Sequence, residues 1–130
     1  MTELSSDEAF EAAIAATRVL PSSSSSSSPP AASVASSPLA VLQFTAAWCG
    51  PCRAIAPLLE KMAEAADPKS VAFYKIDVDD EGVLKSCGDQ NISAVPTFKF
   101  VKGGRVVEEA TVRGADGAAL RAAVEELAPN

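Results

Sequence analysis

Two cysteines, Cys49 and Cys52, have the residue type and spacing to do chemistry together. They belong to the string Trp48-Cys49-Gly50-Pro51-Cys52, which follows an apolar run and precedes a helical pattern that begins near Cys52. A thiolate is the reactive form of cysteine, and the free N–H groups and positive dipole end of a helix N-terminus favour an anion. We expect Cys49, just before the helix, to gain most from this, and Cys52, one turn inside, to be more buried.

This spacing predicts a dithiol that exchanges disulfides. Cys49 attacks a substrate disulfide as a thiolate, and Cys52 then attacks Cys49 and releases the reduced substrate. Gly50 permits the tight turn and the close approach of a partner, and Pro51 stiffens the loop without adding charge. A cation there would stabilise the reduced thiolate, so Pro51 favours a reductant over an oxidant. The alternatives for the pair alone are half of a zinc site or two inert thiols.

The composition removes several classes of chemistry. Three cysteines and no histidine fall short of the four ligands of a structural zinc site and exclude histidine-dependent catalysis, so we expect no metal. The net charge of −6 comes without a basic stripe, which argues against a nucleic-acid partner. No apolar run approaches the roughly 18 residues of a membrane-spanning helix, so we expect no membrane association.

The pattern of strands places the dithiol at the end of a buried central strand. The near-continuous apolar run 39–45 is typical of a strand covered on both faces, and 71–78 reads as a second one. A third strand is predicted at 97–101, and Gly103-Gly104 then indicates a hairpin with one return strand at 105–112. A very short strand is expected at 2–4.

Helices are predicted between these strands. Ser6 is a good N-cap for a helix that Pro21 stops, and Asp67-Pro68 closes the helix after the dithiol. A short helix is expected at 81–86, ended by Gly88 and Asn91, and Asp116 should cap a final helix. Strand–helix–strand units followed by a hairpin predict an α/β fold, with one mixed central sheet flanked by helices.

The domain organisation is simple except for one segment. At 130 residues the chain is expected to form a single domain, 1–130, with a dithiol-bearing core at 39–128. Residues 21–38 contain an unbroken serine run followed by prolines, which predicts a flexible Ser/Pro-rich insertion, disordered in the fold. It is either a tolerated surface insertion or a phosphorylated regulatory tract.

A set of short strings occurs in order along the chain: Trp48 to Arg53, Pro57, Lys75 to Asp79, Val95-Pro96-Thr97, Lys102-Gly103-Gly104 and Gly114. Together they resemble the thioredoxin family, and the resemblance implies the thioredoxin fold. The fuller strings 44–47 and 92–97 are most similar to the o-type thioredoxins of plants.

The resemblance also implies a site and partners. Pro96 should be a cis-proline facing the dithiol, and Lys75 should lie beneath the active site and help to set its charge. An apolar docking surface for substrates is expected from Trp48, Val95, Pro96, Gly114 and Ala115. The implied function is reduction of disulfides in target proteins by a monomer that binds no cofactor, and whose Cys49–Cys52 disulfide is reduced by a thioredoxin reductase.

Two positions raise questions. Many thioredoxins carry a buried aspartate, thought to relay a proton for the buried cysteine, where this chain has Gln43; because Gln43 cannot ionise, the acceptor for Cys52 is open. Cys87 lies outside the motif. It is either a small, partly buried residue or a regulatory thiol that dimerises or becomes glutathionylated.

The leading function is therefore a protein-disulfide reductase that maintains redox homeostasis. The alternative is a redox-gated binding module with little turnover, and an oxidase or isomerase of a secretory compartment comes third. We expect an intracellular location. The o-type resemblance points to mitochondria, whereas the acidic residues near the N-terminus are unlike a transit peptide, which leaves the cytosol as the alternative.

Overall fold

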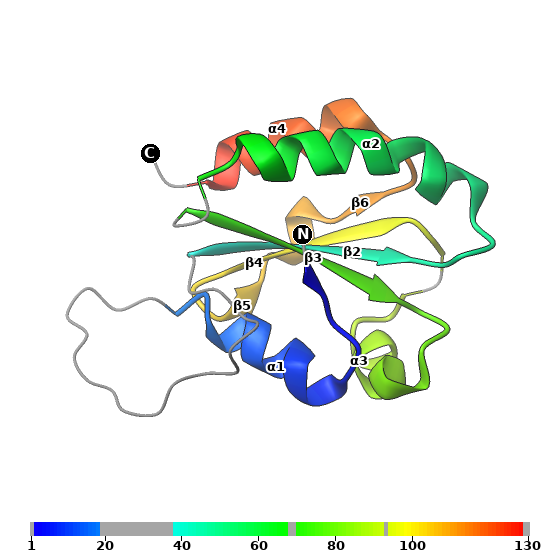
Figure 1. Ribbon diagram of the computed structural model, residues 1–130. Coiled ribbons are helices and arrows are strands. Elements are labelled where there is room, and N and C mark those ends of the chain that lie inside the picture. The colour runs from blue at the N-terminus through cyan, green and yellow to red at the C-terminus, as the bar shows by residue number, and fades with distance from the viewer. Residues whose placement is uncertain (1, 19–37, 68–69, 93, 129–130) are drawn as a thin grey trace.

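A computed structural model describes residues 2–18, 38–67, 70–92 and 94–128. In it, one mixed sheet lies between two layers of helices (Figure 1). Helices α1 (Asp7–Ala15) and α3 (Leu84–Asp89) cover one face, and α2 (Gly50–Ala65) and α4 (Gly117–Leu127) cover the other. The expected α/β architecture is confirmed, while the predicted insertion 21–38 lies, apart from Pro38, outside the described residues. None of the helices in the described part is long and apolar enough to cross a membrane.

The sheet is built around strand β2 (Leu39–Thr45). It pairs in parallel with β3 (Val71–Asp77) on one side and antiparallel with β4 (Thr97–Lys102) on the other. The short β1 (Thr2–Glu3) extends the sheet beyond β3. Every residue of β2 is buried, as expected for a central strand with helices on both faces.

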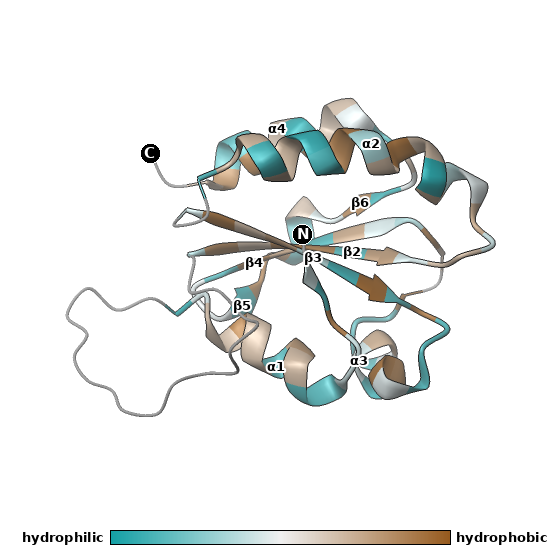
Figure 2. Cartoon of the chain, in the orientation of Figure 1, coloured by the Kyte–Doolittle hydropathy of each residue, from teal (hydrophilic) through white to brown (hydrophobic). Residues whose placement is uncertain are grey.

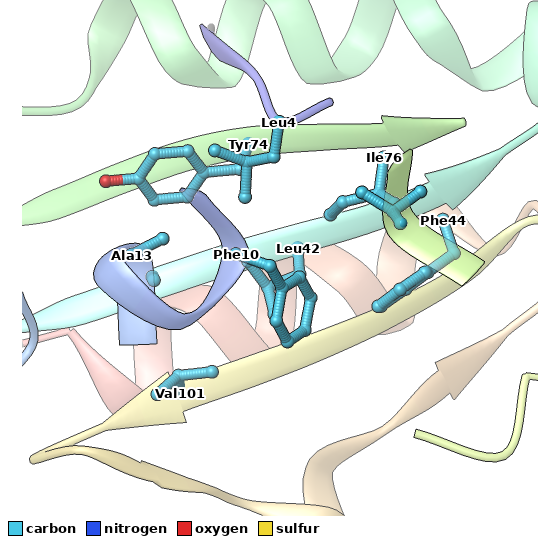
Figure 3. Close-up of a cluster of buried hydrophobic side chains, with 10 residues drawn as sticks. Leu4, Phe10, Ala13, Leu42, Phe44, Tyr74, Ile76 and Val101 are labelled. Atoms are coloured by element: carbon cyan, nitrogen blue, oxygen red, sulfur yellow. The ribbon is translucent and has the colours of Figure 1, made fainter. Parts of the chain in front are cut away.

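Side chains of the central strands alternate between two cores. On one face, Leu42 and Phe44 pack with Phe10 of α1 (Figure 3), and on the other, Val41 packs with Ile55 of α2. The helices turn apolar faces to the sheet and polar faces outward (Figure 2). Because successive side chains of a strand point to opposite faces, each central strand offers an apolar surface to both helical layers.

The return chain after the hairpin differs from the predicted continuous strand 105–112. It forms β5 (Arg105–Val106), a 3₁₀ turn (Glu108–Ala110) and β6 (Val112–Arg113). Between the pairs Val101↔Val106 and Phe98↔Val112, two residues of β4 face five of the return chain, so three extra residues must leave the ladder. The excursion brings Glu108 to the buried Lys99, whose Nζ lies 2.7 Å from its carboxylate.

Two helix boundaries also differ from the prediction. Helix α2 begins at Gly50 rather than near Cys52, because Cys49 itself is the N-cap. Gly88 does not break the short helix: a 3₁₀ turn (Glu81–Val83) leads into α3, which runs past Gly88 to Asp89. Asn91 does end this region, with a φ of 56°.

The packing of α1 on β2 gives a first prediction. Phe10 is 3% exposed and its ring centroid lies 6.1 Å from that of Phe44. Replacing Phe10 with Ala should lower the free energy of unfolding by roughly 3–5 kcal/mol, through lost burial and the cavity left behind. Urea unfolding followed by circular dichroism measures this. Leu84→Ala, at a side chain 58% exposed, is the control and should change it by less than about 0.5 kcal/mol. Equal effects of the two substitutions would contradict the assignment of Phe10 to the core.

A second prediction concerns acid stability. Asp7 Oδ1 accepts hydrogen bonds from the Ser86 hydroxyl (2.6 Å) and the Ser86 N–H (2.8 Å), and these bonds lower the pKa of Asp7. Because the folded pKa is depressed, the stabilisation is present above the unfolded value and is lost as pH falls through the folded one. Unfolding midpoints measured between about pH 6 and about pH 3 should therefore fall more steeply in the wild type than in Asp7→Asn. Parallel curves for the two proteins would count against this linkage.

Candidate active site

Three segments that are distant in sequence meet at one edge of the sheet. The parallel strands β2 and β3 both end there, and the antiparallel β4 begins there. The dithiol follows β2, the turn with Asp79 follows β3, and Val95-Pro96 immediately precedes β4. Sheet topology thus assembles the site from pieces that are each local in sequence.

The two cysteines form a disulfide across the first turn of α2. Their Cα atoms are 5.3 Å apart, and the Cys52 N–H donates to Cys49 Sγ over 3.1 Å. Pro51 lies in the first turn, where its missing N–H has no intrahelical partner to lose. The sulfur of Cys49 therefore lies where the helix offers a free donor and its positive dipole end, an arrangement that favours the thiolate.

The burial of the two cysteines corrects one expectation. Cys52 is not the more buried of the pair, since both are 3% exposed. Cys49 packs with Ala46 and Cys52, and Val95 and Val78 border this cluster. The segment before β4 therefore helps to cover the N-cap cysteine, a tertiary contact absent from the local pattern.

Trp48 is the most exposed large apolar residue in the described part of the chain, with 66% of its surface accessible. Its position is set by a hydrogen bond of 2.8 Å from the indole Nε1 to Oδ2 of Asp79. Sequence reasoning missed Asp79 as a site residue, although it belongs to the string after β3. An exposed aromatic ring that one hydrogen bond holds in place is suited to contact another protein.

The predicted docking residues are only partly brought together. The Val95–Pro96 peptide is cis, and the carbonyl of Pro96 accepts a bond of 2.8 Å from the Gly114 N–H. Trp48 and Val95 line one groove of about 760 Å³. Ala115 is exposed and lies outside that groove. The remaining groove residues, which the sequence did not indicate, come from the turn after β3, from α3 and from the following loop: Val78, Cys87, Gly88, Asn91, Ile92 and Ala94.

Gln43 and Lys75 lie beneath the dithiol. They are register partners on β2 and β3, and Gln43 is 4% exposed on the face that α2 covers. Both line a cavity of about 350 Å³ that Cys52 also lines. Lys75 and Cys52 thus line the same cavity, and the expected role of Lys75 in setting the charge of the site stays a prediction.

Cys87 has a different environment from the dithiol. It lies on α3, partly buried, and has no disulfide partner in the described part of the chain. Burial raises the pKa of the Cys87 thiol, and the carboxylates of Asp7, Asp77 and Asp80 raise it further. A thiol held protonated is a poor nucleophile.

Comparisons with known proteins place these features in a family. A family model described as Thioredoxin matches residues 30–126. Mitochondrial thioredoxin O2 of Arabidopsis thaliana is 42% identical over 88 residues, which make up 68% of this chain and 53% of that protein. A thioredoxin of Malassezia sympodialis is 40% identical over 88 residues, or 68% of this chain and 80% of that protein.

The solved structures agree with these relatives. The crystal structure of oxidised A. thaliana thioredoxin O2 matches with a TM-score of 0.73 at 33% identity, covering 98% of this chain and 94% of the other. The chain spans about half of the length of the plant mitochondrial relatives that it matches.

The Trp48–Asp79 bond yields a third prediction. Asp79→Ala removes the acceptor, whereas Asp79→Asn keeps an amide oxygen at the same place. Because a hydrogen bond contributes about 0.5–1.5 kcal/mol, exchange of the indole N–H should accelerate up to about tenfold in Asp79→Ala and much less in Asp79→Asn. Trp48 is the only tryptophan, so its indole resonance and fluorescence anisotropy report this bond alone. Unchanged exchange and anisotropy in Asp79→Ala would show that the bond does not hold the ring in solution.

Proposed function

The chain belongs to the thioredoxin family and has its fold, and from this premise we propose that it is a thiol–disulfide oxidoreductase that reduces protein disulfides. The observation that carries the proposal is the Cys49–Cys52 disulfide at the N-terminus of α2. Its position at the edge of the sheet leaves it beside the exposed ring of Trp48.

The reaction proceeds in two exchanges. In the reduced protein, the Cys49 thiolate attacks one sulfur of the substrate disulfide, and the other sulfur leaves as a thiolate that takes up a proton. Cys52 then loses its proton and attacks Cys49 Sγ, closing the Cys49–Cys52 bond and releasing the second substrate sulfur. Two electrons pass from the dithiol to the substrate disulfide.

We assign substrate docking to the groove beside the dithiol. Trp48 and Val95 provide apolar walls, and the cis peptide before Pro96 turns the backbone of Val95 at the edge of the site. An extended substrate segment would pair with that backbone as an added strand. Two further residues complete this surface: Gly114, whose N–H donates a hydrogen bond to the carbonyl of Pro96, and the neighbouring exposed Ala115.

The proposed partners follow from the same reaction. Each cycle leaves the protein oxidised, so an external reductant must restore the dithiol; we assign this to a thioredoxin reductase, with no bound cofactor in the chain itself. We further propose that the protein is a monomer and that it acts on many disulfide-containing proteins.

A Cys52→Ser variant tests the range of targets, because it should trap many of them as mixed disulfides through Cys49. One stoichiometric partner that survives reductant would instead indicate a redox-gated binding module.

A mitochondrial location is proposed from the o-type relatives, which are described as mitochondrial. Imaging the product of the full transcript fused to a fluorescent protein tests it. Coincidence with a mitochondrial marker is expected, and a diffuse cytosolic signal would reject it.

Disulfide reduction itself gives a fourth prediction. With dithiothreitol as reductant, the wild type should accelerate the reduction and precipitation of insulin at least about tenfold over dithiothreitol alone, since a thiolate favoured by the helix N-terminus replaces a mostly protonated thiol. Cys49→Ser should return the rate to that of the reductant alone. Leu84→Ala, outside the groove, serves as the substituted control and should retain the wild-type rate. Equal rates for wild type and Cys49→Ser would reject the proposed function.

A further inference from the structure

The proton of Cys52 has to go somewhere when Cys52 attacks Cys49. Cys52 is 3% exposed, and the neighbouring Gln43 has no ionisable group. The cavity of about 350 Å³ that Cys52 lines offers the route, because it runs between α2 and the strands beneath it. This inference rests on the proposed function and concerns its second exchange.

A row of polar side chains forms the floor of this cavity. Gln43 on β2, Lys75 on β3 and Glu3 on β1 are successive register partners in parallel pairing. Register partners project to the same face of a sheet, so all three face α2, as the buried Val41 two residues before Gln43 does. The row connects the surroundings of Cys52 to the outer edge of the sheet.

The cavity is expected to hold water. Among the hydrogen bonds of the described residues, none engages the amide of Gln43, which is 4% exposed and lines the cavity. The amide atoms of Gln43 are not among the fully enclosed side-chain atoms that lack a partner, so open space in the cavity reaches them and water can satisfy them. The volume far exceeds the roughly 10–15 Å³ that one water needs, so several waters fit.

Glu60 is the carboxylate that α2 places over this row. Cys52, Ala56 and Glu60 follow one another at intervals of four residues along one side of the helix, and all three line the cavity. The Cα–Cβ bonds of a helix tilt toward its N-terminus, so the side chain of Glu60, an exposed residue, starts out in the direction of the small Ala56 and of Cys52. The helix rise between the two residues is about 12 Å, which water must bridge.

The other charged groups around the cavity are less suited than Glu60 to accept the proton of Cys52. Lys75 and Arg53 are cations, and the guanidinium of Arg53 donates to the carbonyl of Ala47 over 2.7 Å. Asp77 accepts the Asp79 N–H through Oδ1 and so shapes the turn that holds Trp48. Glu3 lies two strands away from Gln43. The carboxylate of Glu60 makes no hydrogen bond or ion pair within the described residues. Glu60 also lines a second hollow, together with Glu3 and Lys75.

We propose that Glu60 accepts the Cys52 proton through the water of this cavity. As Cys52 Sγ bonds to Cys49 Sγ, the bond from Cys49 to the substrate sulfur breaks, and the thiol proton passes along water to the Glu60 carboxylate. From there it leaves to solvent past Lys75, and the departing substrate thiolate takes a proton from solvent. Glu60 acts through water and is a positioning residue for the proton.

The test separates the two exchanges. Reduced protein is mixed in a stopped-flow instrument with 5,5′-dithiobis(2-nitrobenzoate), which releases a coloured thiolate at each exchange. The attack by Cys49 depends on reagent concentration, whereas the attack by Cys52 does not. All proteins carry Cys87→Ser, so that only the dithiol reacts. Glu60→Gln is compared with Glu64→Gln, since Glu64 lines the outer hollow but not the cavity of Cys52.

In Glu60→Gln the second phase should slow about tenfold near neutral pH, below the 10²–10⁴ of a direct general base because water intervenes. The first phase should change less than about twofold, and added formate should restore the second phase in proportion to its concentration. Glu60→Asp should retain most of the rate, which separates the effect from misfolding. Glu64→Gln and Asp77→Asn should match the wild type in the second phase.

The sign of the effect is itself diagnostic. If Glu60 acted only as a charge, its removal would lower the pKa of Cys52 and speed the second phase. A faster or unchanged second phase in Glu60→Gln, or a loss confined to Asp77→Asn, would overturn the assignment while leaving the disulfide reductase intact. Absence of both phases in the parent protein would instead reject the proposed function, and the inference with it.

Discussion

The pairing of β2 on both sides is the constraint on which the site depends. Seven residues of β2 pair with β3 and six pair with β4, so the strand has a fixed register and a fixed end at Thr45. The chain must then leave the sheet, and within five residues it enters α2, with Cys49 as its N-cap. The sulfur is held at a helix N-terminus because the strand before it cannot slip without turning every buried side chain to the wrong face. The same register sets Val95-Pro96 and Asp79 at that edge.

Much of this arrangement could be predicted because its signals are local. The bounds of β2 follow from a near-continuous apolar run, and the Cys49–Cys52 pair follows from spacing. The misses arise where long-range contacts decide. The return chain contains three valines and a threonine, which suit a strand, yet three extra residues between its two paired ends force it out of the ladder. The cluster that buries both Cys49 and Cys52 is bordered by Val95, which is more than forty residues away in sequence. Asp79 was missed as the partner of Trp48 for the same reason.

On the face of the sheet under α2, the residue at position 43 determines how near to Cys52 an ionisable group lies. An ionised side chain on β2 beside Cys52 would occupy a site of low dielectric, where its charge acts strongly on the thiol. Gln43 is polar but carries no charge, and the nearest ionisable groups then lie further out, on β3, on α2 and at the edge strand β1. Any proton that leaves Cys52 must cross a longer hydrated distance. The small side chain of Ala56 is as necessary to that route as the polar ones, because a larger residue would fill the space between helix and sheet.

Cys87 gives an internal comparison for the dithiol, since it borders the same groove as Trp48 and Val95. It has the same functional group as Cys49, yet burial and three nearby carboxylates raise the pKa of its thiol, whereas Cys49 receives the Cys52 N–H at a helix N-terminus. The two environments push the thiols in opposite directions, toward the neutral form and toward the anion. On the docking proposed above, a substrate disulfide in the groove therefore meets one sulfur that is favoured as the thiolate, Cys49, and one that is held protonated, Cys87.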